Sequence, residues 1–157
     1  MDLDSAYKWS KDGLVDFNLL KCVVMHFGPN NKLHNYRMGS VELSNSVCER
    51  DLGVVFSSDL KWKQQSIACV SKANAMLGMI KNNFVKLDTR MVKILYTVYV
   101  RPLIEFAVPV WSPYLKGDIN LIEKVQHRAT RLIPGLKKLP YYERLEKLGL
   151  STLENEE

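Results

Sequence analysis

Residues 60–84, LKWKQQSIACVSKANAMLGMIKNNF, contain the clearest helical pattern in the chain. Apolar side chains recur there three and four positions apart, a spacing that places them on one face of a helix. That face comprises Trp62, Cys69, Ala73, Met76, Leu77, Ile80 and Phe84, and the opposite face comprises Gln64, Ser71, Asn74, Gly78, Lys81 and Asn82. The segment therefore predicts an amphipathic helix with one buried side.

A second helix is predicted over residues 88–107, and its apolar face is wider. The face comprises Val92, Leu95, Tyr96, Tyr99, Leu103 and Phe106, with Met91, Ile94 and Val98 beside it. Its polar residues Arg90, Lys93, Thr97 and Arg101 are spaced three and four apart, so they are expected to form one line. Pro102 is expected to kink this helix because proline removes a backbone donor.

Two shorter helices are predicted nearer the carboxyl end. One is expected to start at Asp118, a suitable N-cap, and to end before Pro134-Gly135. The next runs from Pro140 to the terminator Gly149. The stretch Ser151-Thr152-Leu153-Glu154 has a capping-box pattern that announces a further helix.

Strand signals dominate the chain before residue 60. After a short amphipathic helix that closes at Gly13, residues 21–27 predict a strand, 28–31 a turn and 35–38 a returning strand, which together make a hairpin. Residues 41–43 and 51–56 predict further strands, separated by the turn-prone Ser44-Asn45-Ser46. The whole pattern predicts an α+β fold, a small antiparallel hairpin or sheet followed by a helical bundle.

Charge is unevenly distributed between these two parts. The 157 residues carry a net charge of +5. Residues 1–59 hold 6 basic and 8 acidic side chains, a net of −2, whereas residues 60–147 hold 16 basic and 6 acidic side chains, a net of +10. A split of this kind predicts two lobes, the second suited to an anionic partner.

No motif for a known catalytic, cofactor or metal site occurs in the sequence. His26, His34 and His127 are isolated from one another, and phosphate-binding loops and nucleophile turns are absent. The three cysteines, Cys22, Cys48 and Cys69, favour reduced thiols. We therefore assign no catalytic, cofactor-binding or metal residue. With neither a membrane-spanning run nor a signal peptide, we expect an intracellular protein, cytoplasmic or nuclear.

The basic faces of the helical lobe could follow a phosphate backbone, because lysine and arginine neutralise phosphates. For any one lysine, a solvated surface position is the simpler interpretation. Tyrosine and tryptophan side chains fall mostly on apolar faces, so we interpret them as core residues. The predicted contacts with a nucleic acid are Lys63, Lys72, Lys81, Arg90, Lys93, Arg101, Lys124, Arg128 and Arg131.

A series of motifs runs in order through nearly the whole chain. It comprises Trp9, Phe17-Asn18-x-x-Lys21-Cys22-x-Val24-Met25-x-Phe27-Gly28, Glu49-Arg50-Asp51-Leu52-Gly53-Val54, Ser71-Lys72-Ala73-Asn74-x-Met76-Leu77-Gly78-x-Ile80-Lys81, Leu95-Tyr96-x-x-x-Val100-Arg101-Pro102-x-Ile104-Glu105-Phe106, Trp111-x-Pro113 and Ile122-Glu123-x-Val125-Gln126-x-x-Ala129-Thr130. The series resembles the late part of the reverse transcriptase, an RNA-directed DNA polymerase, of jockey-like non-LTR retrotransposons.

The resemblance implies that residues 1–59 are the carboxyl-terminal remnant of the polymerase palm and residues 60–157 a thumb-like subdomain. Asp51, Leu52 and Gly53 would then lie in the hairpin that steadies the primer end. The implied partners are an RNA template and a DNA primer and, in an intact polymerase, the missing palm and fingers; no membrane is implied.

The family polymerises with paired aspartates that hold Mg²⁺, and this chain has no Ala-Asp-Asp motif. We therefore expect a truncated fragment that is inactive alone and needs no cofactor. Two alternatives stay open, a basic RNA- or DNA-binding module without catalysis and the product of a decayed element with no selected role. Because palm strands would be missing, we also expect an open sheet edge near Val23, Met25 and Phe27, and poor solubility.

Overall fold

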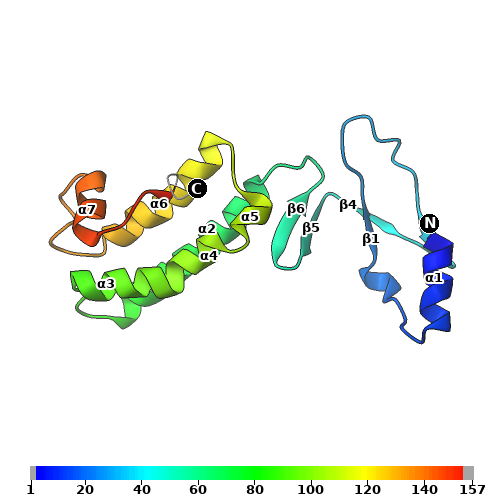
Figure 1. Ribbon diagram of the computed structural model, residues 1–157, viewed down its shortest axis with the longest axis horizontal. Helices are drawn as coiled ribbons and strands as arrows, with labels where there is room; N and C mark the ends of the chain where they lie inside the picture. Colours follow the sequence, from blue (N-terminus) through cyan, green and yellow to red (C-terminus); the bar gives the residue numbers. More distant parts are fainter. Residues whose placement is uncertain (1–2, 154–157) are drawn as a thin grey trace. The chain divides into compact units, whose positions relative to one another are not determined.

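The computed structural model describes residues 3–153 and has the predicted α+β fold. The chain divides into two compact units, Met1–Lys61 and Trp62–Glu157. The first unit holds one α-helix and all the strands, and the second is helical (Figure 1).

Short elements make up the first unit. They are α1 (Leu3–Asp12), the 3₁₀-helix η1 (Leu19–Lys21), β1 (Val23–Met25), β2 (Arg37–Met38), β3 (Val41–Glu42), β4 (Ser44–Ser46), β5 (Cys48–Asp51) and β6 (Val54–Ser57). α1 packs closely on the turn between β2 and β3. A Cβ at Gly39, where φ is +60°, would lie 2.8 Å from the ring of Tyr7, so glycine permits both the turn and the contact.

The strands pair differently from the sequence prediction. β1 pairs in parallel with β4, Val23 opposite Ser44, whereas β2 pairs with β3 and β5 with β6 in antiparallel hairpins. The predicted hairpin over residues 21–38 is therefore wrong, and Ser44–Ser46 is a strand instead of a turn. Asn31 closes the intervening loop locally, since its side chain donates to Phe27 O (3.3 Å) and accepts from Leu33 N (2.9 Å), so the loop does not align β1 with β2.

The second unit contains seven helical segments in its described part. They are α2 (Lys63–Asn83), α3 (Thr89–Leu95), the π-helical turn η2 (Tyr96–Val100), α4 (Arg101–Glu105), α5 (Val108–Trp111), α6 (Lys116–Thr130) and α7 (Tyr141–Leu148). α2 lies against both α4 and α6 (Figure 1). Its buried face includes Cys69, Ala73, Leu77 and Ile80, as the periodicity of residues 60–84 predicts.

The second predicted helix is interrupted by the π turn. The amide of Arg101 donates to Tyr96 O, five residues back, because Pro102 cannot continue the regular ladder. The buried face consists of Val92, Tyr96, Val100 and Ile104. The predicted face is therefore partly wrong, since Tyr99 and Phe106 are exposed.

The segment after α4 was expected to be helical to residue 107. Instead α4 ends at Glu105, Ala107 adopts a left-handed conformation (φ 56°), and α5 begins at Val108. The indole Nε1 of buried Trp111 donates to Phe106 O (2.6 Å), which satisfies a carbonyl beyond the end of α4. The hydrogen bond of Trp111 thereby stabilises the junction between α4 and α5.

The last two helices differ from prediction mainly at one cap. α6 begins at Lys116 after Leu115, so Asp118 is not its N-cap; it is a buried residue of the first turn, whose amide donates to Leu115 O (2.9 Å). α7 ends at Gly149, as predicted. Glu154, on which the capping-box prediction depends, lies outside the described residues.

Candidate nucleic-acid interface

A basic surface hollow lies where α2 and α6 end. It is lined by Lys81, Phe84, Val85, Leu87, Arg131, Leu132, Pro134 and Lys137 and has a volume of about 420 Å³. None of these lining residues is acidic. We call this group of residues the basic hollow.

Two helix ends position the cations. Lys81 lies in the last turn of α2, and Arg131 is the C-cap of α6. Each helix C-terminus carries about half a negative charge, so three cations leave an excess of about two positive charges. The hollow therefore has the charge to attract phosphate, and its apolar lining residues offer contact to a sugar or base.

Arg128 lies one turn before Arg131 and connects the same two helices. Its Nη1 donates to Asn74 Oδ1 of α2 at 2.5 Å. On α2, Asn74, Gly78 and Lys81 follow one another at helical spacing, and a Cβ at Gly78 would meet no atom within 4 Å. The surface beside the basic hollow is thus open at the α2 backbone.

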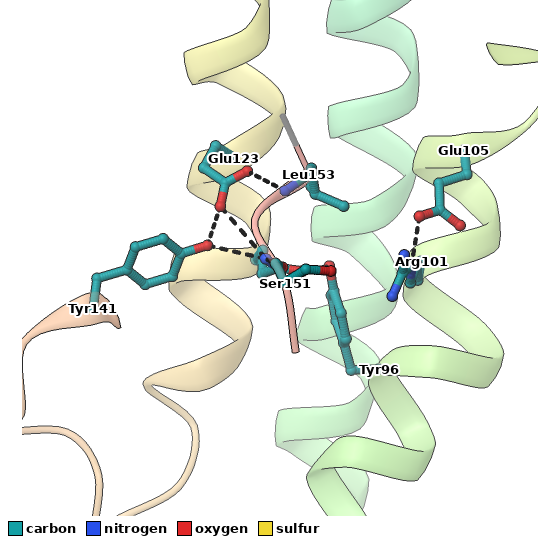
Figure 2. Close-up of polar contacts among 8 residues, drawn as sticks. Tyr96, Arg101, Glu105, Glu123, Tyr141, Ser151 and Leu153 are labelled. Atoms are coloured by element: carbon teal, nitrogen blue, oxygen red, sulfur yellow. Dashed lines mark hydrogen bonds and ion pairs between the residues drawn. The ribbon is translucent and has the colours of Figure 1, made fainter. Parts of the chain in front are cut away.

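The predicted polar line on the second helix does not act as one group. The side chain of Arg101 is only 20% exposed and forms an ion pair with Glu105 (Nε–Oε1 2.5 Å). Lys93 lies near the end of α7, because a Cβ at Gly149 would be 3.2 Å from its Nζ. Lys93 and Arg101 therefore have different surroundings, one near α7 and the other paired with Glu105 (Figure 2).

Other predicted contacts are exposed but do not line the basic hollow. These are Lys63, Lys72, Arg90 and Lys124.

Asp51, Leu52 and Gly53 belong to the first unit, at the tip of the β5–β6 hairpin. Leu52 and Gly53 both have positive φ, 46° and 89°, and Leu52 is 90% exposed. Two positive φ values define the tight turn that suits a twisted hairpin, where asparagine and glycine are the usual residues. An exposed leucine in that conformation is unusual.

Sequence patterns missed part of the basic hollow. Lys137 lies between helices, where no periodicity relates it to Lys81 or Arg131; the only signal is the pair Lys137-Lys138 after Pro134-Gly135. The prediction that aromatic residues form the core is also only partly right. Tyr96 and Trp111 are buried, whereas Trp9, Tyr36, Tyr99, Tyr114 and Tyr142 are exposed.

Within residues 3–153, no three histidine, cysteine, aspartate or glutamate side chains gather as a group able to hold a metal ion. None of the helices in the same range has both the length and the apolar character needed to cross a membrane. Comparisons with known protein families, curated proteins and solved structures found no match to this chain.

Proposed function

We propose that this chain is a palm and thumb fragment of a retrotransposon reverse transcriptase and that its helical unit holds a nucleic acid through the basic hollow. The observation that carries the proposal is the convergence of Lys81, Arg131 and Lys137 in a hollow lined by no acidic residue. The motif series and the +10 charge of residues 60–147 support it from the sequence.

The chemistry of the basic hollow suits binding without base selection. Lysine and arginine recognise phosphate through charge, and phosphate contacts carry no direct sequence information. A polymerase product must be held whatever its sequence, so contacts of this kind are appropriate to the proposed origin. Binding should weaken steeply as salt concentration rises, because phosphate neutralisation releases counterions.

A binding module without catalysis is the second candidate, and the same convergence of cations favours it. The two candidates differ in polymerisation and share the interface. The sequence contains no Ala-Asp-Asp motif, so we expect no polymerisation by this chain alone.

Fluorescence anisotropy with a labelled RNA–DNA duplex tests the interface. The double variant Lys81→Glu with Arg131→Glu should bind at least about tenfold more weakly and lower the salt slope by about two. The control, Lys116→Glu with Lys147→Glu, changes net charge equally on the same unit, outside the basic hollow. Equal weakening by both variants would mean that overall charge, rather than the hollow, governs binding.

Primer extension with Mg²⁺ or Mn²⁺ tests the expected lack of polymerisation. The purified chain should incorporate no more nucleotide than a heat-inactivated sample. Incorporation above that background would refute the inactive fragment and favour an enzyme whose metal ligands lie outside the family motif.

A further inference from the structure

Phe84 is the aromatic residue in the lining of the basic hollow. The periodicity of residues 60–84 predicted a buried Phe84, but its side chain is 38% exposed. α2 ends at Asn83 and the backbone of Phe84 is extended (φ −115°, ψ 116°), so this residue does not continue the buried face of the helix. Val85, which also lines the hollow, is fully exposed. An aromatic ring and a neighbouring apolar side chain are therefore accessible to a ligand.

Two further apolar residues of the hollow are held by the hydrophobic core. Leu87 and Leu132 pack against a buried cluster that includes Ile133 and Leu136. Side chains packed in this way lose little conformational freedom when a ligand binds, which lowers the cost of binding. The apolar part of the lining is thus largely preformed.

The three cations of the basic hollow are available to an anion. Lys81, Arg131 and Lys137 are all exposed. Neither of the salt bridges among residues 3–153 involves any of them. A nucleotide combines a flat base, which stacks on aromatic rings, with a phosphate, which lysine and arginine neutralise. It therefore complements both the apolar and the charged part of this lining.

The size of the hollow and the aromatic contact together favour one unpaired nucleotide. The volume of about 420 Å³ lies in the lower part of the range for small-ligand sites, roughly 300–1,000 Å³. Inside a duplex, both faces of each base are covered by the neighbouring base pairs, so an unpaired base is the one that can stack on Phe84. Such stacking is tolerant of sequence, because every base has a π face.

We propose that the basic hollow receives one unpaired nucleotide of a single strand, with its base stacked on Phe84 and the flanking phosphates held by Lys81, Arg131 and Lys137. This preference rests on the proposed function, because it names the form of nucleic acid that the same interface binds best. Phe84 is then the residue that distinguishes a single strand from a duplex, whereas the three cations contact the phosphates of either form.

Fluorescence anisotropy with three labelled probes tests the preference. The probes are oligo(dT) of about 12 nucleotides, an abasic oligomer of the same length, and a blunt RNA–DNA duplex. The unchanged chain should bind oligo(dT) about tenfold more tightly than the abasic oligomer, which has the same phosphates and no bases. Phe84→Ala should weaken binding of oligo(dT) about tenfold and change binding of the other two probes by less than about twofold. The salt slope should not change, because no charge is removed.

Further variants separate the aromatic ring from folding and from general exposure. Circular dichroism checks folding, and Phe84→Leu, which keeps an apolar side chain, replaces Phe84→Ala if the latter does not fold. Phe84→Trp should retain binding of oligo(dT), because it keeps an aromatic face. The matched control is Tyr142→Ala, which removes an aromatic side chain that is 74% exposed on α7 and does not line the hollow. It should bind all three probes as the unchanged chain does.

The preference is overturned if the unchanged chain binds the abasic oligomer as tightly as oligo(dT), a comparison that needs no variant. It is also overturned if a folded Phe84 variant without the ring weakens all three probes equally. If Lys81→Glu with Arg131→Glu weakens oligo(dT) and the duplex while loss of the ring weakens neither, the proposed function stands and the preference fails. If that double variant weakens no probe beyond its control, Lys116→Glu with Lys147→Glu, the interface itself fails.

Discussion

At the scale of single residues, Arg144 is the most unusual side chain of the helical unit. It is only 1% exposed, and its Nη1 donates to two neutral oxygens, Thr130 Oγ1 (2.8 Å) and His127 O (3.1 Å). Its guanidinium carbon also lies 5.4 Å from the ring centre of Tyr141. A buried cation depends on such contacts because burial removes its hydration.

His127 lies next to this cation, and its charge should affect stability. Burial lowers the pKa of His127 below its usual range, and Arg144 and Arg131 lower it further, although Glu123 opposes them. The unfolded chain therefore takes up this proton more readily as pH falls. The free energy of unfolding should decrease as pH falls below about 6.5 and level off once pH is below the folded-state pKa.

Urea unfolding at pH values between 7.5 and 5 measures this effect. The variant His127→Gln should lose part of the dependence, because glutamine does not titrate. An equal dependence in the variant and the unchanged chain would contradict the role of His127.

Leu52 should carry a conformational cost at the tip of the β5–β6 hairpin. A left-handed conformation costs a non-glycine residue about 1–2 kcal/mol, and asparagine tolerates it better. Leu52→Asn should therefore stabilise the first unit by about 1 kcal/mol, measured by urea unfolding. Leu52→Ala is the control, since alanine removes the exposed side chain and keeps the strain, so no gain is expected. A loss of stability in Leu52→Asn would show that the leucine side chain is held by a favourable contact.

The sequence predicted residues of the candidate interface only where they lie on a helix, because helical periodicity shows which side chains share a face. Lys81 and Arg131 were expected on polar helix faces and line the basic hollow, whereas Lys137 comes from an irregular segment. Gln126 is polar and fully buried, and its side chain forms hydrogen bonds with Tyr96 and Tyr141. Both partners lie in other helices, distant from Gln126 in the sequence. Pairings of that kind leave no local signal in sequence.

At the scale of elements, the π turn explains why the second helix buries a different face from the one predicted. Val92, Tyr96, Val100 and Ile104 are spaced four apart and are all buried. In a regular helix, steps of four would turn Ile104 about 120° away from Val92. The extra residue of a π turn offsets about 100° of this rotation, so one face stays toward the core.

This account predicts that one residue can be removed from η2. Deleting exposed Val98 should convert the π turn to a regular helix, keep the buried face in phase, and change the free energy of unfolding by less than about 1 kcal/mol. The matched control deletes exposed Ala75 from α2. It should rotate Leu77 and Ile80 out of the core and destabilise the protein by several kcal/mol.

Circular dichroism and urea unfolding of the two deletion variants distinguish these outcomes. If loss of Val98 is as damaging as loss of Ala75, the extra residue is needed for packing, and the phase argument fails.

The strands were less predictable than the helices. Helical hydrogen bonds are local, so the periodicity of residues 60–84 was enough to predict α2. The partner of β1 is β4, and loop residues, β2 and β3 separate them in sequence. Short strands with weak alternation do not specify such a partner, because strand pairing depends on distant contacts.

At the scale of the whole molecule, the two units differ in how much core they contain. Among the described residues, the buried hydrophobic side chains of the first unit are Met38, Leu43 and Val54, whereas the second unit has 16 of the 19. Val23 and Phe27 beside the short sheets are exposed, as expected for an open edge, although Met25 is half-buried. Buried apolar area is the main source of stability, so the units should differ in stability.

Hydrogen exchange followed by mass spectrometry should show this difference directly. Amides of β1–β6 should exchange through low-energy openings, because their strands are short and have little core beneath them. Amides in the middle of α2 and α6 should exchange at least tenfold more slowly, since opening them exposes Ala73, Leu77 and Val125 together. Intrinsic rates from unfolded peptides of the same sequence are the control. Equal protection in both units would contradict the expected difference in their stability.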